Sequence, residues 1–273
     1  LVDTQKIAVI APDFRLCPQV SIAEVSTDVA DACNFVLEGK LSDVLSSSAQ
    51  VKVQFSTSSW CLGGSSAGGW VPTLLGLGLD SFSPAFENVP KLASNPTSIF
   101  SIYPIQTISK ADAPYCYEKL KPVPWLLSPT AKPGTLIEDE AMRPFLKHDA
   151  EIVSSAPPLK APERAPLYSY ARQEGIYPQL VLPEGASAED ISVSSLLTKL
   201  SGDKVPHRPK SIYLAYGTGD VHVPPSQSEL LSESLKAAGL EPAVDVFEGK
   251  AHLWDMAEDV TLPKLWETIS KAF

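Results

Sequence analysis

The feature that most constrains this chain is a glycine–serine pentapeptide, Gly64-Ser65-Ser66-Ala67-Gly68, between two apolar stretches. Residues 60–62 before it predict a short buried strand, and residues 70–79 after it predict an apolar helix. A strand that turns into a helix over so few residues needs glycine, because side chains in the turn would collide with the strand or the helix. The pattern predicts a sharp strand–turn–helix unit with Ser66 at its apex.

The rest of the chain alternates between short apolar runs and segments with helical periodicity. Apolar residues at spacings of three and four predict a helix over residues 22–37, with Ser21 as its N-cap and Gly39 at its end. We predict further strands at residues 6–11, 99–105, 211–216 and 243–247, further helices at 226–238 and 262–273, and a serine-rich loop at 42–59. This alternation predicts an α/β fold, with a mostly parallel central sheet flanked by helices.

Between residues 111 and 209 the sequence becomes rich in proline, and two helices are predicted there, at 138–150 and 188–200. We therefore predict an α/β core of residues 1–110 and 210–273, interrupted by a helical cap insertion at 111–209. Most aromatic residues of the insertion are expected to pack it onto the core, and some to line a substrate pocket: Tyr115, Tyr117, Trp125, Tyr168, Tyr170 and Tyr177.

The pentapeptide fits the G-x-S-x-G pattern of a nucleophile elbow, which requires a strand before it and a helix after it. Such a turn exposes the Ser66 hydroxyl beyond the carboxyl end of the sheet. The N–H of Ala67 then points into the same space as a donor for an oxyanion. Ser65 does not fit the pattern, because Ala67 would occupy the second glycine position. The pattern predicts Ser66 as a nucleophile.

A serine hydroxyl is a weak nucleophile and needs a base, which an acid orients. His252 follows the predicted strand at 243–247, and Asp220 follows the predicted strand at 211–216 in a glycine-containing turn. The carboxyl ends of parallel strands share one end of a sheet, and the chain order serine, acid, histidine suits such a sheet. We predict a triad of Ser66, Asp220 and His252.

The other ionisable residues are poorer candidates for these roles. Two histidines fall in or beside the insertion and are expected at the surface or in packing: His148 and His207. Three aspartates lie before a strand, within a strand or after the histidine: Asp203, Asp245 and Asp255. His222, two residues after Asp220, is interpreted as a loop histidine or as part of a substrate pocket. Ser65 and Trp254 are further candidates for substrate binding.

Four stretches together resemble the hormone-sensitive-lipase-like esterases of the α/β-hydrolase fold. Asp13-Phe14-Arg15-Leu16-Cys17-Pro18-Gln19 resembles D-Y-R-L-A-P-E, and the stretch from Gly64 to Gly69 resembles G-D-S-A-G-G. Gly219-Asp220-Val221 resembles the acid-bearing turn, and the stretch from Gly249 to Trp254 resembles G-x-x-H-x-F. Ser65 and Gln19 replace acidic residues of the family pattern. The resemblance covers most of the chain except the insertion. It implies hydrolysis of small or medium carboxylic esters through an acyl-enzyme, without a cofactor or a metal.

The family also carries an H-G-G-G stretch that supplies the rest of its oxyanion hole, and this sequence has no such stretch. In the family it precedes the fourth strand, which corresponds here to residues 6–11, and the third strand lies between the fourth and the fifth. The resemblance therefore implies that a segment before Leu1, or another chain, supplies the second oxyanion donor and completes the sheet. Without it, strand edges would stay unpaired.

The acidic composition narrows the range of partners. A formal net charge of −10 and a pI of about 4.9 disfavour nucleic acids, which need a basic surface, and favour a small neutral or cationic substrate. No apolar run reaches the roughly 18 residues of a transmembrane helix. Four cysteines (Cys17, Cys33, Cys61 and Cys116) form no C-x-x-C pair and no metal-like spacing with histidine. We expect free thiols and a cytoplasmic protein, with secretion as the alternative.

Other functions share parts of this pattern. A lactonase, an arylformamidase or a peptidase would use the same triad, which the fold alone does not distinguish from an esterase. A non-catalytic ligand-binding protein of this fold would keep the serine turn and lose the histidine, so the presence of His252 argues against it. A scaffold protein with a residual triad would show no activity on a wide range of esters.

Overall fold

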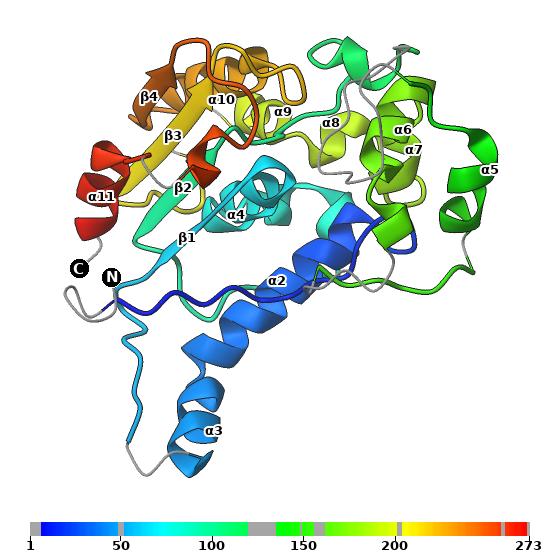
Figure 1. The fold of residues 1–273 in the computed structure, drawn as a ribbon. Helices are drawn as coiled ribbons and strands as arrows, with labels where there is room; N and C mark the ends of the chain where they lie inside the picture. The colour runs from blue at the N-terminus through cyan, green and yellow to red at the C-terminus, as the bar shows by residue number, and fades with distance from the viewer. Residues whose placement is uncertain are drawn as a thin grey trace.

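The computed structural model describes residues 7–48, 52–119, 135–147, 149–155, 162–200, 204–257 and 260–271. Four parallel strands form one sheet, and they lie side by side in chain order (Figure 1). They are β1 (Cys61–Ser65), β2 (Ser98–Ile102), β3 (Ser211–Gly217) and β4 (Ala243–Phe247). The strands predicted at residues 60–62, 99–105, 211–216 and 243–247 are confirmed, although β2 is shorter than expected. Their carboxyl ends lie together at one end of the sheet.

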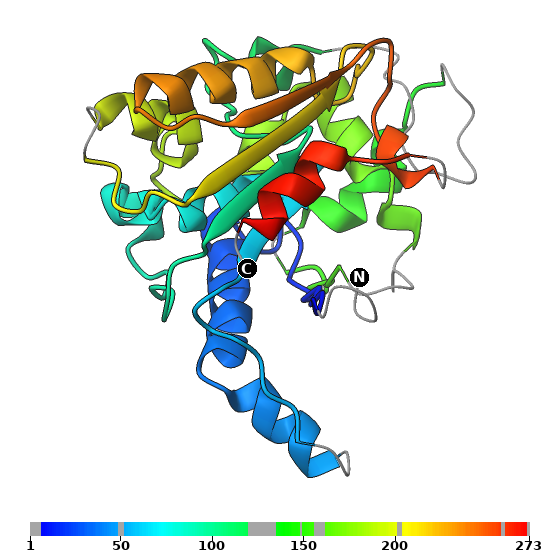
Figure 2. The ribbon, with the colours of Figure 1, turned by 90° about the vertical axis from the view of Figure 1, so that its left-hand side faces the viewer.

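Alternating residues of the strands enter two hydrophobic clusters, one on each face of the sheet. Ile212 and Leu214 of β3 lie in the larger cluster, whereas Tyr213 and Ala215 lie in the smaller one. Helices cover both faces, and Figure 2 shows the C-terminal helix, α11, lying across one of them. These helices are α2 (Ile22–Leu37), α4 (Trp70–Gly76), α10 (Pro225–Ala237) and α11 (Pro263–Ser270). The predicted three-layer α/β architecture is confirmed.

Helix α2 shows how local sequence determines both ends of an element. The N–H of Ser21 donates to the Glu24 carboxylate at 2.8 Å, and the two residues form a capping box. Gly39 lies just beyond the C-terminus with a φ of +85°, a left-handed conformation that favours glycine. Both predicted ends of this helix are confirmed.

The segment between β2 and β3 contains helices and, among its described residues, no strand of the sheet. These helices are α5 (Asp139–Met142), α6 (Leu167–Glu174), α7 (Tyr177–Val181), α8 (Ala188–Ile191) and α9 (Val193–Lys199). The helix predicted at 188–200 is broken at Ser192, because its hydroxyl accepts the N–H of Ser195 at 3.2 Å and caps α9. Helices α8 and α9 pack in the main core. A separate small cluster consists of Ile137, Met142, Leu167 and Tyr170.

Short 3₁₀ turns complete the described secondary structure. These turns are η1 (Ser66–Gly69), η2 (Leu79–Phe82), η3 (Pro84–Phe86), η4 (Pro114–Cys116), η5 (Arg143–Leu146), η6 (Pro162–Arg164) and η8 (Trp254–Met256). The predicted helix at 138–150 is represented by α5 and by η5, the turn that follows it.

Two predictions for the first sixty residues are wrong. Residues 7–11 form no strand, because no strand of the described part of the chain pairs with them, and Val9 is 71% exposed. The backbone bridge nearest to them is an isolated one between Arg15 and Ser154. The expected loop at 42–59 begins instead with part of helix α3 (Lys40–Ser48), whose apolar residues recur at helical spacing. Helix α3 projects away from the sheet, as Figure 2 shows.

Within the described residues, no helix has both the length and the apolar character needed to cross a membrane. All four cysteines are unpaired, as expected. Burial raises the pKa of Cys17, Cys33 and Cys61 to about 11. These thiols therefore stay protonated at neutral pH.

Candidate active site

Ser66 lies in the turn between β1 and α4. Its φ is +55°, a conformation that costs a non-glycine residue of the order of 1–3 kcal/mol and persists only where the surrounding structure imposes it. A Cβ atom on Gly64 would overlap the carbonyl oxygen of Gly68, so glycine is required there. A Cβ atom on Gly68 would meet no other atom, because Gly68 borders a cavity. Collision of a side chain with the turn, which the sequence pattern predicts at both glycines, therefore explains Gly64 and does not explain Gly68.

The three residues of the predicted triad come together at the carboxyl end of the sheet. Nδ1 of His252 lies 2.6 Å from Oδ2 of Asp220, and Nε2 of His252 lies 3.0 Å from Oγ of Ser66. A carboxylate only accepts hydrogen bonds, so Nδ1 carries the proton and Nε2 is free to accept the proton of the serine hydroxyl. The side chains of His252 and Asp220 are 2% and 1% exposed, so little water competes for these contacts. This geometry can move a proton from Ser66 to His252.

Backbone contacts hold the Asp220 turn against the loop that carries His252. The N–H of Gly219 donates to the carbonyl of Lys250 at 3.0 Å, and a Cβ atom on Gly217 or Gly219 would overlap carbonyl oxygens of this loop. Oδ1 of Asp220 accepts the N–H groups of His222 and Val223, both at 2.9 Å. These two bonds leave Oδ2 directed at the histidine.

Tyr103 also belongs to this site, and it was not predicted from the sequence. It follows β2 with a φ of +39° and is 1% exposed, and its ring centre lies 4.5 Å from that of His252. Its hydroxyl donates to Asp255, beyond the histidine loop, and also interacts with Ser65. Burial, and then the Asp255 carboxylate, raises the pKa of Tyr103 well above its usual value, so the hydroxyl remains a donor. No local pattern could have revealed these long-range contacts.

The other predicted site residues have different surroundings. Ser65 and Ala67 line the cavity. Trp254 packs in the smaller hydrophobic cluster, with its ring centre 4.0 Å from that of Phe247, and it does not line the cavity. His222 is buried, with its ring centre 5.8 Å from that of His252. Burial, and then the neighbouring His252, lowers the pKa of His222, so its ring is neutral at pH 7.

The residues judged poorer candidates make structural contacts where they are described. Nε2 of His207 lies 2.7 Å from the carbonyl oxygen of Pro96, and Asp245 forms an ion pair with Lys264 at 2.6 Å. His148, Asp203 and Trp125 lie outside the described residues. In the described part of the chain, no three His, Cys, Asp or Glu side chains gather in a way that could hold a metal ion.

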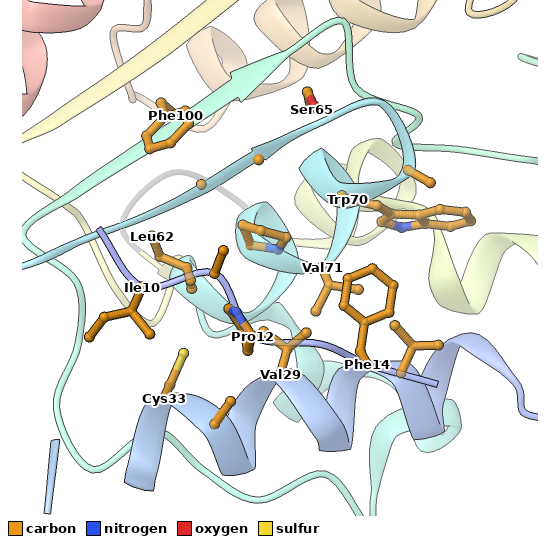
Figure 3. A pocket seen from close by; sticks show the side chains of 18 of the residues that line it. Ile10, Pro12, Phe14, Val29, Cys33, Leu62, Ser65, Trp70, Val71 and Phe100 are labelled. Atoms are coloured by element: carbon orange, nitrogen blue, oxygen red, sulfur yellow. The ribbon is translucent and has the colours of Figure 1, made fainter. Parts of the chain in front are cut away.

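A largely apolar cavity of about 1660 Å³ opens beside the serine turn and follows the outer edge of β1 (Figure 3). Figure 3 shows Ile10 and Pro12 between β1 and helix α2. Strand β1 pairs with β2 on one side and has no strand partner on the other among the described residues. Apolar side chains come to this cavity from helices belonging to both faces of the sheet: Val25 and Val29 of α2, Trp70 and Val71 of α4, and Leu265 and Ile269 of α11.

Comparison with solved structures places this chain in the α/β-hydrolase fold. The chain is similar to esterase B from Lactobacillus rhamnosis, with 14% identity, a TM-score of 0.52, and coverage of 95% of this chain and 64% of that one. A structure of the same esterase inhibited by a tributyrin phosphonate gives 12% identity, a TM-score of 0.50, and coverage of 94% and 61%. This chain therefore spans less than two thirds of their length. No protein-family model matches the sequence, and no curated protein does.

Proposed function

We propose that this chain carries the catalytic residues of a serine hydrolase that cleaves carboxylic esters through an acyl-enzyme. The observation that carries the proposal is the hydrogen-bonded row of Ser66, His252 and Asp220, with Ser66 held at a φ of +55° in a strand–helix turn. The four sequence stretches of the hormone-sensitive-lipase-like esterases support the same function. Small or medium acyl groups are the proposed substrates.

The geometry supports a two-step reaction. Oγ of Ser66 attacks the ester carbonyl carbon while Nε2 of His252 takes the hydroxyl proton, and the N–H of Ala67 donates to the oxyanion. His252 then gives that proton to the departing alcohol, which leaves Ser66 acylated. A water molecule attacks the acyl carbon while His252 takes one of its protons. The acid departs and the proton returns to Ser66. Asp220 stabilises the imidazolium in both steps.

Labelling with a fluorophosphonate tests the activated serine. The wild-type chain should form one adduct on Ser66, mapped by mass spectrometry, and S66A should form none. The matched control S65A removes the neighbouring hydroxyl and should still carry its adduct on Ser66. An adduct on Ser65, or no adduct on folded protein, contradicts the proposal. Hydrolysis of p-nitrophenyl esters of increasing acyl length then separates short-chain from long-chain preference.

The proposed enzyme also needs a second oxyanion donor, and the edge of β1 indicates where it would come from. The cavity along this edge has apolar walls from helices of both faces, which is the environment of a strand buried inside a parallel sheet. Gly68 borders this space, and its missing side chain leaves room for another backbone to approach. The proposal is that a further strand, from polypeptide not included in this sequence, pairs with β1 and brings the donor.

Hydrogen exchange tests this completion of the sheet. In the 273-residue chain alone, the amides of residues 61–65 are expected to exchange faster than those of β3, since β1 has one pairing edge and β3 has two. In protein purified from its natural source, slow exchange in β1 should accompany polypeptide mass beyond 29.3 kDa. A mass of 29.3 kDa together with equally slow exchange in β1 and β3 contradicts an added strand.

The insertion is proposed to act as a cap in its α5 to α7 portion, which has a small hydrophobic cluster of its own. Helices α6 and α7 also reach the main core, through Ala171, Tyr177 and Val181. Tyr168 and Tyr177 from this portion line the cavity along β1 and pack against the main core, so they are proposed to hold the insertion on the core. Helices α8 and α9 belong to the main core and are better described as support for the sheet.

A further inference from the structure

A buried arginine of helix α6 contacts the turn that carries Asp220. Arg172 is 4% exposed, and its Nη1 donates to the carbonyl oxygen of His222 at 2.6 Å. Tyr168, one helical turn earlier, donates its hydroxyl to the same oxygen at 2.9 Å. The Arg172 guanidinium also lies over the ring of Tyr115, 4.5 Å from its centre. Helix α6 therefore makes two side-chain hydrogen bonds to one carbonyl oxygen of the acid turn.

Burying the charged side chain of Arg172 is unfavourable in free energy, and packing alone would not offset it. Among the described residues no carboxylate forms an ion pair with it, and its Nε has no hydrogen-bond partner. An unpaired buried charge is strongly unfavourable unless polar groups around it compensate. Its compensation here comes from a carbonyl oxygen, a tyrosine hydroxyl and an aromatic face, all of which remain neutral. No carboxylate among the described residues neutralises the charge, so it polarises the peptide group to which the carbonyl belongs.

The carbonyl that Arg172 contacts belongs to the same peptide unit as the N–H of Val223. That N–H donates to Oδ1 of Asp220 at 2.9 Å, and Oδ2 of Asp220 lies 2.6 Å from Nδ1 of His252. A positive charge on the carbonyl oxygen polarises the peptide unit and strengthens the hydrogen bond that its N–H donates. A continuous row thus runs from Arg172 through one peptide group to Asp220, His252 and Ser66.

We propose that Arg172 is a positioning residue of the triad, and that helix α6 orients the Asp220 carboxylate through the peptide group between His222 and Val223. This inference rests on the proposed function for the role of the triad. It makes the inserted segment part of the catalytic unit as well as a cover over it. The Tyr168 hydroxyl supports the same carbonyl and has a smaller effect because it carries no charge.

The test combines a reactivity measurement with a spectroscopic one on the 273-residue chain. R172M removes the charge and keeps an aliphatic chain. It is expected to slow fluorophosphonate labelling of Ser66 about tenfold, the loss expected for one charge-assisted hydrogen bond. The far-downfield proton resonance of the hydrogen bond between His252 Nδ1 and Asp220 should shift or broaden in the same variant. R172K, which restores a charge, should recover part of both.

The matched control is R143M, since Arg143 lies in the same insertion and its side chain is 67% exposed. It should label at the wild-type rate. Y168F, which deletes a single hydroxyl, covers the case in which R172M does not fold, and it should slow labelling a few-fold. The inference would be overturned if R172M and Y168F label as fast as R143M and show the same proton resonance for the hydrogen bond between His252 and Asp220. Absence of labelling in the wild type contradicts the proposed function instead, and the resonance then still reports whether Arg172 acts on Asp220.

Discussion

Replacing His252 with alanine is expected to lower kcat/KM for an ester substrate by about 10⁴- to 10⁶-fold, measured with a p-nitrophenyl ester at pH 7. The hydroxyl of Ser66 loses the acceptor that lies 3.0 Å away, and no other residue among the described ones is hydrogen-bonded to it. His222 does not replace it, because its ring centre lies 5.8 Å from that of His252. Uncatalysed attack by a neutral hydroxyl then limits the rate.

Two further variants make this result specific to the triad. H207Q changes a histidine whose Nε2 lies 2.7 Å from the carbonyl oxygen of Pro96, away from the triad, and it should retain wild-type kcat/KM. The double variant S66A/H252A should be no slower than either single variant, since residues that act as one unit lose their function together. His252 would not be the base if the loss of kcat/KM in the double variant equals the product of the two single losses, or if H252A alone loses less than about tenfold.

Replacing Gly64 with valine is expected to destabilise the fold by about 3 kcal/mol, at the upper end of the usual range for overpacking. The new Cβ atom would overlap the carbonyl oxygen of Gly68, which is backbone and cannot rotate away. The strand and the helix around Ser66 must then separate, so the positive φ of Ser66 is lost at the same time. Urea unfolding should show a lower midpoint with an unchanged slope.

Gly68 provides the matched control for this variant. A Cβ atom there would have no atom of the described residues within 4 Å apart from its chain neighbours, so G68A should change the free energy of unfolding by no more than about 0.5 kcal/mol. Equal destabilisation by G64V and G68A would mean that the close approach of strand and helix is not what the first glycine permits. Labelling of G64V with a fluorophosphonate should also fail, even at temperatures where the variant is folded.

The elements that local sequence determines could be predicted closely. Helix α2 begins at a capping box and ends before Gly39, and both signals lie within a few residues of the ends. The approach of Ser66, Asp220 and His252 to one another could be predicted because each of them follows a strand of one parallel sheet. Residues 7–11 show the limit of this reasoning: an apolar run becomes a strand only if another strand pairs with it, and pairing is a long-range property.

The parts of the site that the sequence did not indicate depend on contacts between distant residues. Tyr103 reaches Asp255 and His252 from the end of β2, and Arg172 reaches the turn that carries Asp220 from helix α6. Neither residue has a neighbour in sequence that would mark it. The positive φ of Tyr103 is likewise imposed by its surroundings, since tyrosine has no preference for it.

The open side of β1 ties the chemistry of this chain to its colloidal behaviour. Unpaired N–H and C=O groups along a strand edge pair with any other extended polypeptide, including a second copy of the same molecule. This strand runs directly into the turn that begins at Ser66, so its open edge and the serine turn are continuous along the chain. We therefore expect that association of the isolated chain through Cys61–Ser65 would also change the fluorophosphonate labelling of Ser66.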